Sequence, residues 1–240
     1  MVWGMSLPKS GGAYGPYGKY EDDGWRGRLS KYYVEQTPER QATLYSGSKE
    51  GPSWDYPFFV GWKFIGELGT KCTFEDPPLT PIEDHEPPRF FCCEKGFDSL
   101  ASIISLPSGI WAIEETTKNI IERIEPDVHQ FYPIEIRMPR GKVYPITYFT
   151  LVVGQYIESL VPEKCKEGVL RPYGSSNRYH SDESKNAISG RAFSREKFGK
   201  AHLWRERGFG GAFSCLSDEL WDEIRKLNLL MPKHYKMIEV

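Results

Sequence analysis

The stretch HLWRERGFGGAFSCLSDELW, residues 202–221, combines the three kinds of local structure from which this chain is built. Its first part is polar and aromatic and predicts a short strand around KAHLWRE, and the glycine cluster predicts a turn. The following residues predict a helix over 218–227, because Ser217 is a favourable N-cap and acidic residues fill the first turn. Leu216 and Trp221 occupy the two positions of a hydrophobic staple at that N-terminus.

The same stretch places glycines between arginines, a combination that also occurs in phosphate-binding loops. A dinucleotide-binding loop needs the spacing G-x-G-x-x-G, but Gly208 and Gly210 are followed by Phe213 where the third glycine should stand. A P-loop needs Gly-Lys followed by Ser or Thr, which is absent as well. The next helix carries Asp218 and Glu219 at its N-terminus, so its dipole already has compensating carboxylates. We therefore interpret this segment as scaffold.

Helical and extended patterns follow one another in the middle of the chain. FDSLASIIS, which begins at Phe97, and EETTKNIIERIEP, residues 114–126, predict two helices because their apolar residues recur at helical spacing. VHQFYPIEIRM, residues 128–138, and VYPITYFTLVV, residues 143–153, flank the turn PRGK and predict an antiparallel hairpin. YKMIEV, residues 235–240, predicts a final strand. This mixed order predicts an α+β fold with a largely antiparallel sheet and a few packed helices.

The N-terminal part of the chain is rich in aromatic residues, glycine and proline and shows little periodicity. We expect residues 1–57 to be irregular and to wrap their aromatic side chains onto the domain; an aromatic arm that stacks bases is the alternative. FFVGWKFIGELG, residues 58–69, predicts a buried strand or turn. EDPPLTPIEDHEPP, residues 75–88, contains five prolines and neither Lys nor Arg, which predicts an exposed loop. The chain thus divides into a loop-rich N-terminal region, residues 1–95, and an α+β domain, residues 96–240.

Composition and charge argue against several classes of function. The 31 basic and 33 acidic residues nearly cancel, so no molecule-wide field would draw the protein to nucleic acid or anionic lipid. The N-terminus lacks a signal-peptide pattern and no apolar run reaches the roughly 18 residues of a membrane helix, so we expect a cytoplasmic protein. The five cysteines include no C-x-x-C pair, which predicts buried or unreactive free thiols and neither a disulfide framework nor a zinc site. The five scattered histidines show no metal-ligand spacing, and we expect neither a metal nor a cofactor.

Two segments differ sharply in charge. Residues 75–86 carry five acidic side chains and no Lys or Arg, whereas residues 185–207 carry seven basic side chains against two acidic ones. Ordinary solvated surface explains both segments, and the alternative is that one of them binds a macromolecular partner of opposite charge. The candidate partner-binding residues are the three acids nearest the end of the first segment and the two arginines beside the glycine turn: Glu83, Asp84, Glu86, Arg205 and Arg207.

Three stretches of the C-terminal part are distinctive: NIIERIEPDVHQFYPIEI, YFTLVVGQYIESL and the ending that starts with AHLWRERGFGGAFSCLSDELW. Over about residues 100–240 they resemble the immunity proteins of bacterial polymorphic-toxin systems, specifically the family numbered eleven. The resemblance implies a cytoplasmic protein that binds the C-terminal domain of a cognate secreted toxin and occludes or distorts its active site. The family pattern contains no catalytic residues and marks scaffold positions such as Phe131, Pro133, Trp204 and Ser217.

The residues leave two other functions open. A binder of single-stranded nucleic acid would use the basic stretch 185–207 together with three aromatic residues, Phe193, Phe198 and Trp204. An enzyme with a dispersed site would use side chains on sheet strands as acids and bases, for instance His129, Glu135 and His202.

Overall fold

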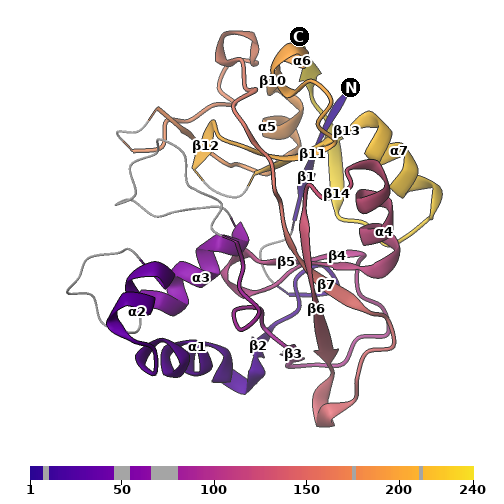
Figure 1. The fold of residues 1–240 in the computed structure, drawn as a ribbon. Helices are drawn as coiled ribbons and strands as arrows, with labels where there is room; N and C mark the ends of the chain where they lie inside the picture. The colour runs from indigo at the N-terminus through magenta and orange to yellow at the C-terminus, as the bar shows by residue number, and fades with distance from the viewer. Residues whose placement is uncertain (8–10, 46–54, 66–80, 175–176, 211–212) are drawn as a thin grey trace.

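The computed structural model describes all residues except 8–10, 46–54, 66–80, 175–176 and 211–212 (Figure 1). The larger of its two main sheets has six strands in the order β2-β3-β6-β7-β5-β4. In that order the strands are Gly18–Tyr20, Phe90–Cys93, Gln130–Arg137, Tyr148–Val152, Trp111–Glu114 and Ile103–Ser105.

The second main sheet has five strands in the order β14-β1-β13-β11-β8. They are Lys233–Lys236, Val2–Ser6, Ser214–Ser217, Leu203–Glu206 and Tyr156–Ile157. Two small parallel pairs join β10 with β15 and β9 with β12, formed by Ala192–Phe193, Ile238–Glu239, Tyr179–His180 and Phe209–Gly210. Most strand pairs of the two main sheets are antiparallel, which confirms the predicted α+β class.

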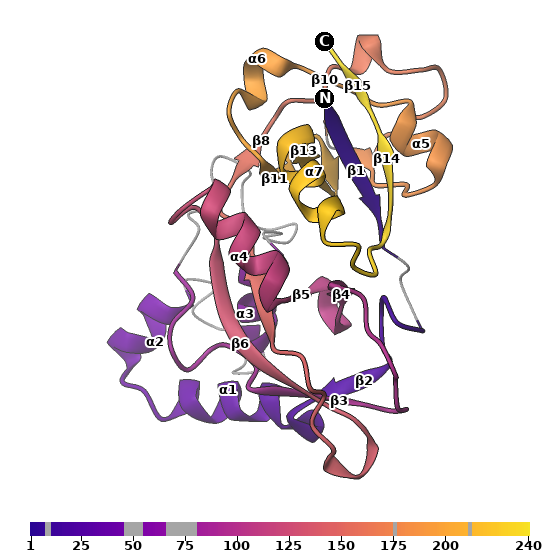
Figure 2. The same cartoon turned by 90° about the vertical axis from the view of Figure 1, so that its right-hand side faces the viewer.

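The helices lie in three places around these sheets (Figures 1 and 2). The first three cover the six-stranded sheet and are α1 Gly24–Val34, α2 Pro38–Leu44 and α3 Asp55–Ile65. Two more pack against each other where the main sheets meet, α4 Glu115–Ile124 and α7 Asp218–Lys226. Two short helices lie near the C-terminus, α5 Lys185–Ser189 and α6 Arg195–Phe198.

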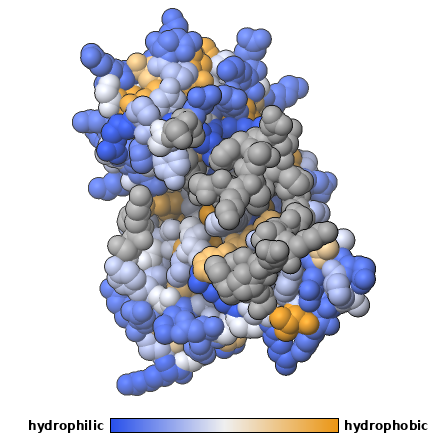
Figure 3. Space-filling model, turned by 90° about the vertical axis from the view of Figure 1, so that its left-hand side faces the viewer, coloured by the Kyte–Doolittle hydropathy of each residue, from blue (hydrophilic) through white to orange (hydrophobic). Residues whose placement is uncertain are grey.

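The three central strands of the five-stranded sheet, β1, β13 and β11, are buried on both faces. Leu203 of β11 belongs to the apolar group that connects the two main sheets with α4 and α7, whereas its neighbour Trp204 belongs to the group on the side of α5 and α6. Successive side chains of a strand point to opposite faces, so β11 contributes to both cores. Figure 3 shows the side of the molecule on which α1–α3 lie, where hydrophilic residues dominate the described surface and hydrophobic residues gather between its upper and lower parts.

The strongest local patterns of the sequence are confirmed. Helix α4 lies within the predicted residues 114–126, and β6 and β7 form the predicted antiparallel hairpin. β11 and α7 agree with the prediction for 202–221, and the Ser217 Oγ accepts a hydrogen bond from the Leu220 N–H at 3.1 Å as an N-cap should. The predicted last strand is present as β14 and β15.

The prediction of an irregular segment over residues 1–57 is wrong for the described residues. β1 lies between β13 and β14 inside the five-stranded sheet, and Gly4 is needed there because an added Cβ would lie 2.8 Å from the Ile188 Cγ2. Helices α1 and α2 and the first residues of α3 occupy further parts of the segment. The division of the chain at residue 95 stays a prediction, although β1 connects the two regions by strand pairing.

Two element predictions were also incorrect. Residues 58–65 belong to helix α3 and do not form a strand or turn. Tyr56, Val60 and Phe64 form the buried stripe of this helix, but apolar residues on its other faces make the helical period of the sequence hard to recognise. Residues 66–69 lie outside the described part. The stretch FDSLASIIS forms no helix: residues 97–102 are irregular and the last three residues form β4. The N–H groups of Leu100 and Ala101 bond to distant segments instead of to a helix.

Candidate functional site

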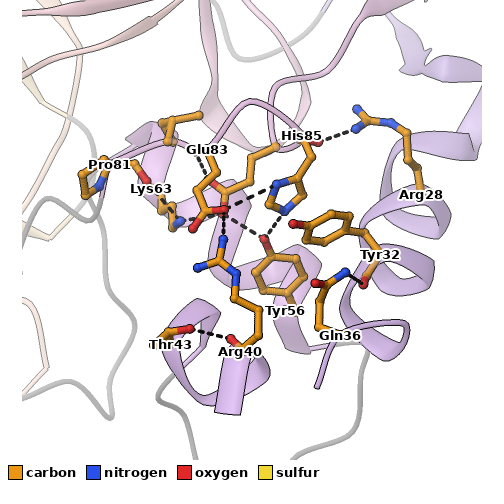
Figure 4. Close-up of polar contacts among 12 residues, drawn as sticks. Arg28, Tyr32, Gln36, Arg40, Thr43, Tyr56, Lys63, Pro81, Glu83 and His85 are labelled. Atoms are coloured by element: carbon orange, nitrogen blue, oxygen red, sulfur yellow. Dashed lines mark hydrogen bonds and ion pairs between the residues drawn. The ribbon is translucent and has the colours of Figure 1, made fainter. Parts of the chain in front are cut away.

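Glu86, which the sequence placed on an exposed loop, is completely buried. Its Oε1 accepts hydrogen bonds from the Lys63 Nζ at 2.5 Å and from the Tyr56 hydroxyl at 2.9 Å, and its Oε2 accepts one from the backbone N–H of Glu83 at 2.8 Å. Lys63 and Tyr56 both come from α3 and point toward the loop (Figure 4). A buried carboxylate is tolerated when its charge is paired and its oxygens are hydrogen-bonded. The expected exposure of Glu86 is therefore wrong, and the residue anchors the loop to α3.

His85 lies between two tyrosines that connect the loop to α1 and α3 (Figure 4). Tyr32 of α1 stacks on the imidazole with ring centroids 3.5 Å apart, and the Tyr56 hydroxyl lies 2.7 Å from Nε2. Burial lowers the pKa of His85 and outweighs the opposing influence of Glu86 and Glu83. Burial, with the nearby charge of Glu86, also raises the pKa of Tyr56 well above its ordinary value. Both rings therefore remain uncharged near neutral pH and hold the loop in place.

Glu83 and Asp84 lie at the surface of this loop, and we call these two residues the acidic edge. The Glu83 side chain is 31% exposed and pairs with Arg40 of α2, and Asp84 is exposed. Arg28 of α1 donates hydrogen bonds to two backbone carbonyls of the loop. The earlier acidic residues of the segment lie outside the described part. The backbone of the loop is thus held by α1 and α3, and α2 contacts the Glu83 side chain through Arg40.

The two candidate arginines lie in and beside the five-stranded sheet, apart from the acidic edge in sequence and in fold. Arg205 is part of β11 and only 2% exposed, with its guanidinium carbon 4.3 Å from the centre of the Trp111 ring. Arg207 follows β11 and is exposed. Arg205 is consequently a packing residue, and Arg207 alone keeps the surface position that the sequence suggested for the pair.

The aromatic residues of the basic stretch are not available for stacking on bases. Phe193, Phe198 and Trp204 are at most 2% exposed and belong to the same buried apolar group. Arg191 from the same stretch is fully buried as well, with its guanidinium near the rings of Phe209 and Phe213. Single-strand binding needs accessible aromatic faces beside a basic groove, and these side chains form a core instead.

Among the described residues, no group of three or more His, Cys, Asp or Glu side chains could hold a metal ion. Every helix in the described ranges is too short or too polar to span a membrane.

Residues 68–239, well over half of the chain, match the immunity protein family Imm11. The chain belongs to the Imm11 immunity protein family. No curated protein matches it. The match includes the acidic edge of this Imm11 protein, the β6–β7 hairpin, β11 and α7, whereas β1 and helices α1–α3 precede it. The helices that hold the acidic edge therefore come from the part of the chain outside the family match.

Sequence reasoning missed the polar centre of this Imm11 protein, Glu125, which is 7% exposed. Its carboxylate accepts hydrogen bonds from the His129 Nε2 at 2.8 Å, the Gln155 Nε2 at 2.6 Å, and the backbone N–H groups of His202 and Leu203 at 2.7 and 2.9 Å. Burial by itself would raise the pKa of Glu125, but the hydrogen bonds lower it below its ordinary value. Glu125 thereby fastens the end of α4 to the start of β11.

The three residues considered for a dispersed catalytic site, His129, Glu135 and His202, do not form one cluster. His129 and His202 meet at Glu125, where His129 is buried and His202 contributes its backbone N–H. Glu135 lies farther along β6 and pairs with Arg137. The sequence signal for this centre was an acidic residue, Glu125, before Pro126 at the end of a predicted helix. This signal did not indicate which distant groups donate hydrogen bonds to Glu125.

A third buried carboxylate, Glu206, explains the acidic residue at the end of the segment LWRE, residues 203–206. Glu206 accepts hydrogen bonds from the Ser159 N–H and from its Oγ, the latter at 2.6 Å, and from the Gly208 N–H at 3.0 Å. The Trp204 Nε1 donates to the same Ser159 Oγ at 3.3 Å. Burial raises the pKa of Glu206 despite these bonds. The motif therefore builds the interior of the five-stranded sheet.

Proposed function

We propose that this protein binds a cognate secreted bacterial toxin and neutralises it in the cytoplasm of the producing cell, through the C-terminal domain of that toxin. Membership of the Imm11 family supports an immunity function. The observation that supports a specific contact surface is the rigid mounting of the acidic edge. Glu83 and Asp84 project from a loop that Glu86 anchors to α3 from inside.

A preorganised pair of carboxylates suits a partner with a basic surface. Arg28 of α1 and Lys63 of α3 already hold the loop backbone by hydrogen bonds to its carbonyl groups, so little conformational entropy is lost when a partner binds. Exposed charges contribute mainly to the rate of encounter and to the choice of partner. The proposed toxin surface at this contact is therefore rich in Lys or Arg, as the surface of a nuclease or other polyanion-binding toxin would be.

The test uses the C-terminal domain of the proposed cognate toxin. The double substitution Glu83→Ser and Asp84→Ser is compared with a matched control, Glu163→Ser and Glu167→Ser, which removes the same charge from exposed positions elsewhere. We expect the first variant to lower the association rate about tenfold at low ionic strength, with the difference shrinking as salt is added. The control variant keeps the wild-type rate. Surface plasmon resonance at several salt concentrations measures both.

The outcome for the contact surface can be told apart from the outcome for the immunity function. Equal association rates for both variants would reject the acidic edge as a contact and leave the immunity function standing. Failure of the wild-type protein to bind that toxin domain, together with failure to protect cells that express it, would reject the proposed function itself.

A further inference from the structure

The connection between β6 and β7 is longer than a hairpin requires. β6 ends at Arg137 and β7 begins at Tyr148, so ten residues, 138–147, join the two strands. Most hairpin loops have about two to five residues. We call residues 138–147 the hairpin loop. It projects beyond the six-stranded sheet at the lower end of the molecule in both views (Figures 1 and 2), and projecting loops on a rigid scaffold are where proteins commonly place binding residues.

Hydrogen bonds hold the hairpin loop in a defined shape. The Met138 N–H donates to the Lys142 carbonyl at 2.7 Å, and the Tyr144 N–H donates to the Ile136 carbonyl at 2.8 Å. The Tyr144 side chain is 7% exposed, and its hydroxyl accepts a hydrogen bond from the Leu100 N–H at 2.9 Å. Tyr144 thus fastens the returning half of the loop to the core of the six-stranded sheet. Because the shape is present before a partner arrives, binding would cost little conformational entropy.

The surface of the hairpin loop is basic and apolar. Except for its first residue and Tyr144, every residue of the loop is exposed. Arg140 and Lys142 are basic, the loop contains no acidic residue, and neither cation forms an ion pair with a described residue. Val143 is 49% exposed and Ile146 is 42% exposed. An unneutralised positive tip beside exposed aliphatic side chains is complementary to an acidic pocket with an apolar rim.

The backbone at the tip does not call for an arginine. Arg140 lies in the 3₁₀ turn Pro139–Gly141 with φ 65° and ψ 22°, in the left-handed region that side chains larger than glycine adopt at a cost. The chain forms the same turn at Pro107–Gly109, where Ser108 has φ 64° and ψ 17°. A serine therefore suits this backbone, and the turn itself does not explain the arginine. Side chains held in such conformations are often placed there for function.

From these observations we propose that Arg140 enters an acidic pocket of the toxin's C-terminal domain, with Lys142 beside it and Val143 and Ile146 against the rim of that pocket. This inference rests on the proposed immunity function. A projecting tip fits a concave surface, and arginine is frequent at the energetic centre of interfaces because its planar guanidinium pairs with a carboxylate through two hydrogen bonds. Nucleic acid is the other polyanion that a basic tip would attract, but single strands need accessible aromatic faces and the exposed side chains here are aliphatic.

The first experiment compares Arg140→Gly with a matched control, Ser108→Gly. Both variants remove a side chain from a left-handed position in the same kind of turn. We expect melting temperatures close to that of the wild type for both, because relief of the left-handed conformation and the greater freedom of the unfolded chain oppose each other. Isothermal titration calorimetry with the toxin's C-terminal domain should show about a tenfold increase in Kd for Arg140→Gly, equivalent to roughly 1.4 kcal/mol, and no change for Ser108→Gly.

Two further variants separate the charge of the tip from its apolar side. Arg140→Glu places a carboxylate in the proposed acidic pocket, so it should weaken binding more than Arg140→Gly does, and the added loss should shrink as salt is raised. Ile146→Ser should weaken binding by a factor that does not depend on salt, because it removes only apolar contact. Equal affinities for Arg140→Glu and Arg140→Gly at low salt would contradict an acidic pocket.

The results for the loop and for the function are distinguishable. Wild-type affinity in Arg140→Gly would overturn the loop contact while the immunity function stands. Absence of any complex between the wild-type protein and the toxin domain would refute the proposed function, and this inference with it. A fluorescently labelled oligonucleotide, single-stranded or duplex, that binds the wild type at low salt and not Arg140→Gly would assign the loop to nucleic acid and overturn the inference.

Discussion

The contribution of Glu125 to stability can be tested by the substitution Glu125→Gln, which preserves side-chain volume. Four donors converge on the carboxylate, two from side chains and two from the backbone at the start of β11. The amide has one acceptor oxygen and one NH₂ group, so at least one buried donor must face another donor. An unsatisfied buried donor costs about 1–3 kcal/mol, and hydrogen bonds to a charged group contribute about 1.5–3 kcal/mol each. We therefore expect the free energy of unfolding to fall by about 3 kcal/mol.

The same variant predicts a change in pH dependence with a definite sign. The pKa of Glu125 is lower in the folded protein than in the unfolded chain. Its stabilising contribution is therefore fully present above the unfolded pKa, about 4.3, and is lost as the pH falls through the folded pKa. Because glutamine does not titrate, the difference in stability between the wild type and Glu125→Gln should narrow as the pH is lowered.

Urea unfolding followed by tryptophan fluorescence, at neutral pH and at several acidic pH values, measures both effects. Glu122→Gln is the matched control on the same helix, since Glu122 is exposed and its ion pair with Lys118 lies at the surface. The control should change stability by no more than about 0.5 kcal/mol. A Glu125→Gln variant as stable as the control, or a difference that widens in acid, would refute this account of the hydrogen-bonded centre.

Two further substitutions test the packing around the acidic edge and the β7–β8 connection. Lys63→Met leaves the buried carboxylate of Glu86 without its cation and should lower the free energy of unfolding by about 3–5 kcal/mol, measured by urea unfolding. Adding Glu86→Leu to this variant should restore most of the lost stability. A Lys63→Met variant with wild-type stability would contradict the buried pair. Gly154→Ala would place a Cβ 1.7 Å from the Val128 carbonyl oxygen, so we expect a large drop in Tm. Gly61→Ala, whose added Cβ would meet no atom of the described residues within 4 Å, should instead raise stability by about 0.5–1 kcal/mol. Equal Tm values for the two alanine variants would disprove the steric argument.

The elements that local sequence predicts well are those whose burial follows one simple period. Helix α4 and helix α7 each bury a stripe and expose charges on the other side, and Ser217 marks the beginning of α7. The β6–β7 hairpin has a readable alternation and a turn between its strands. Helix α3 has no such contrast between an apolar and a charged face. Phe58 and Trp62 on its outer side are as apolar as its core residues, and its lysine, Lys63, is buried.

The candidate site was predicted less well because charge alone does not show exposure. Glu83 and Asp84 remain at the surface as the sequence suggested, but Glu86 and Arg205 are buried by partners from elsewhere in the chain. Glu86 finds its cation 23 residues earlier, on a helix that the sequence did not indicate. The local pattern of five acids in one segment carries no information about such partners.

Composition, periodicity and helix-capping residues were sufficient for the α+β class, the hairpin and the two amphipathic helices, since these depend on neighbours within a few residues along the chain. Tertiary structure decided the rest. The insertion of β1 between β13 and β14 and the polar centre at Glu125 both join segments that are far apart in sequence. Each depends on which distant donor, carboxylate or strand edge satisfies a buried polar group, and burial makes that long-range pairing obligatory.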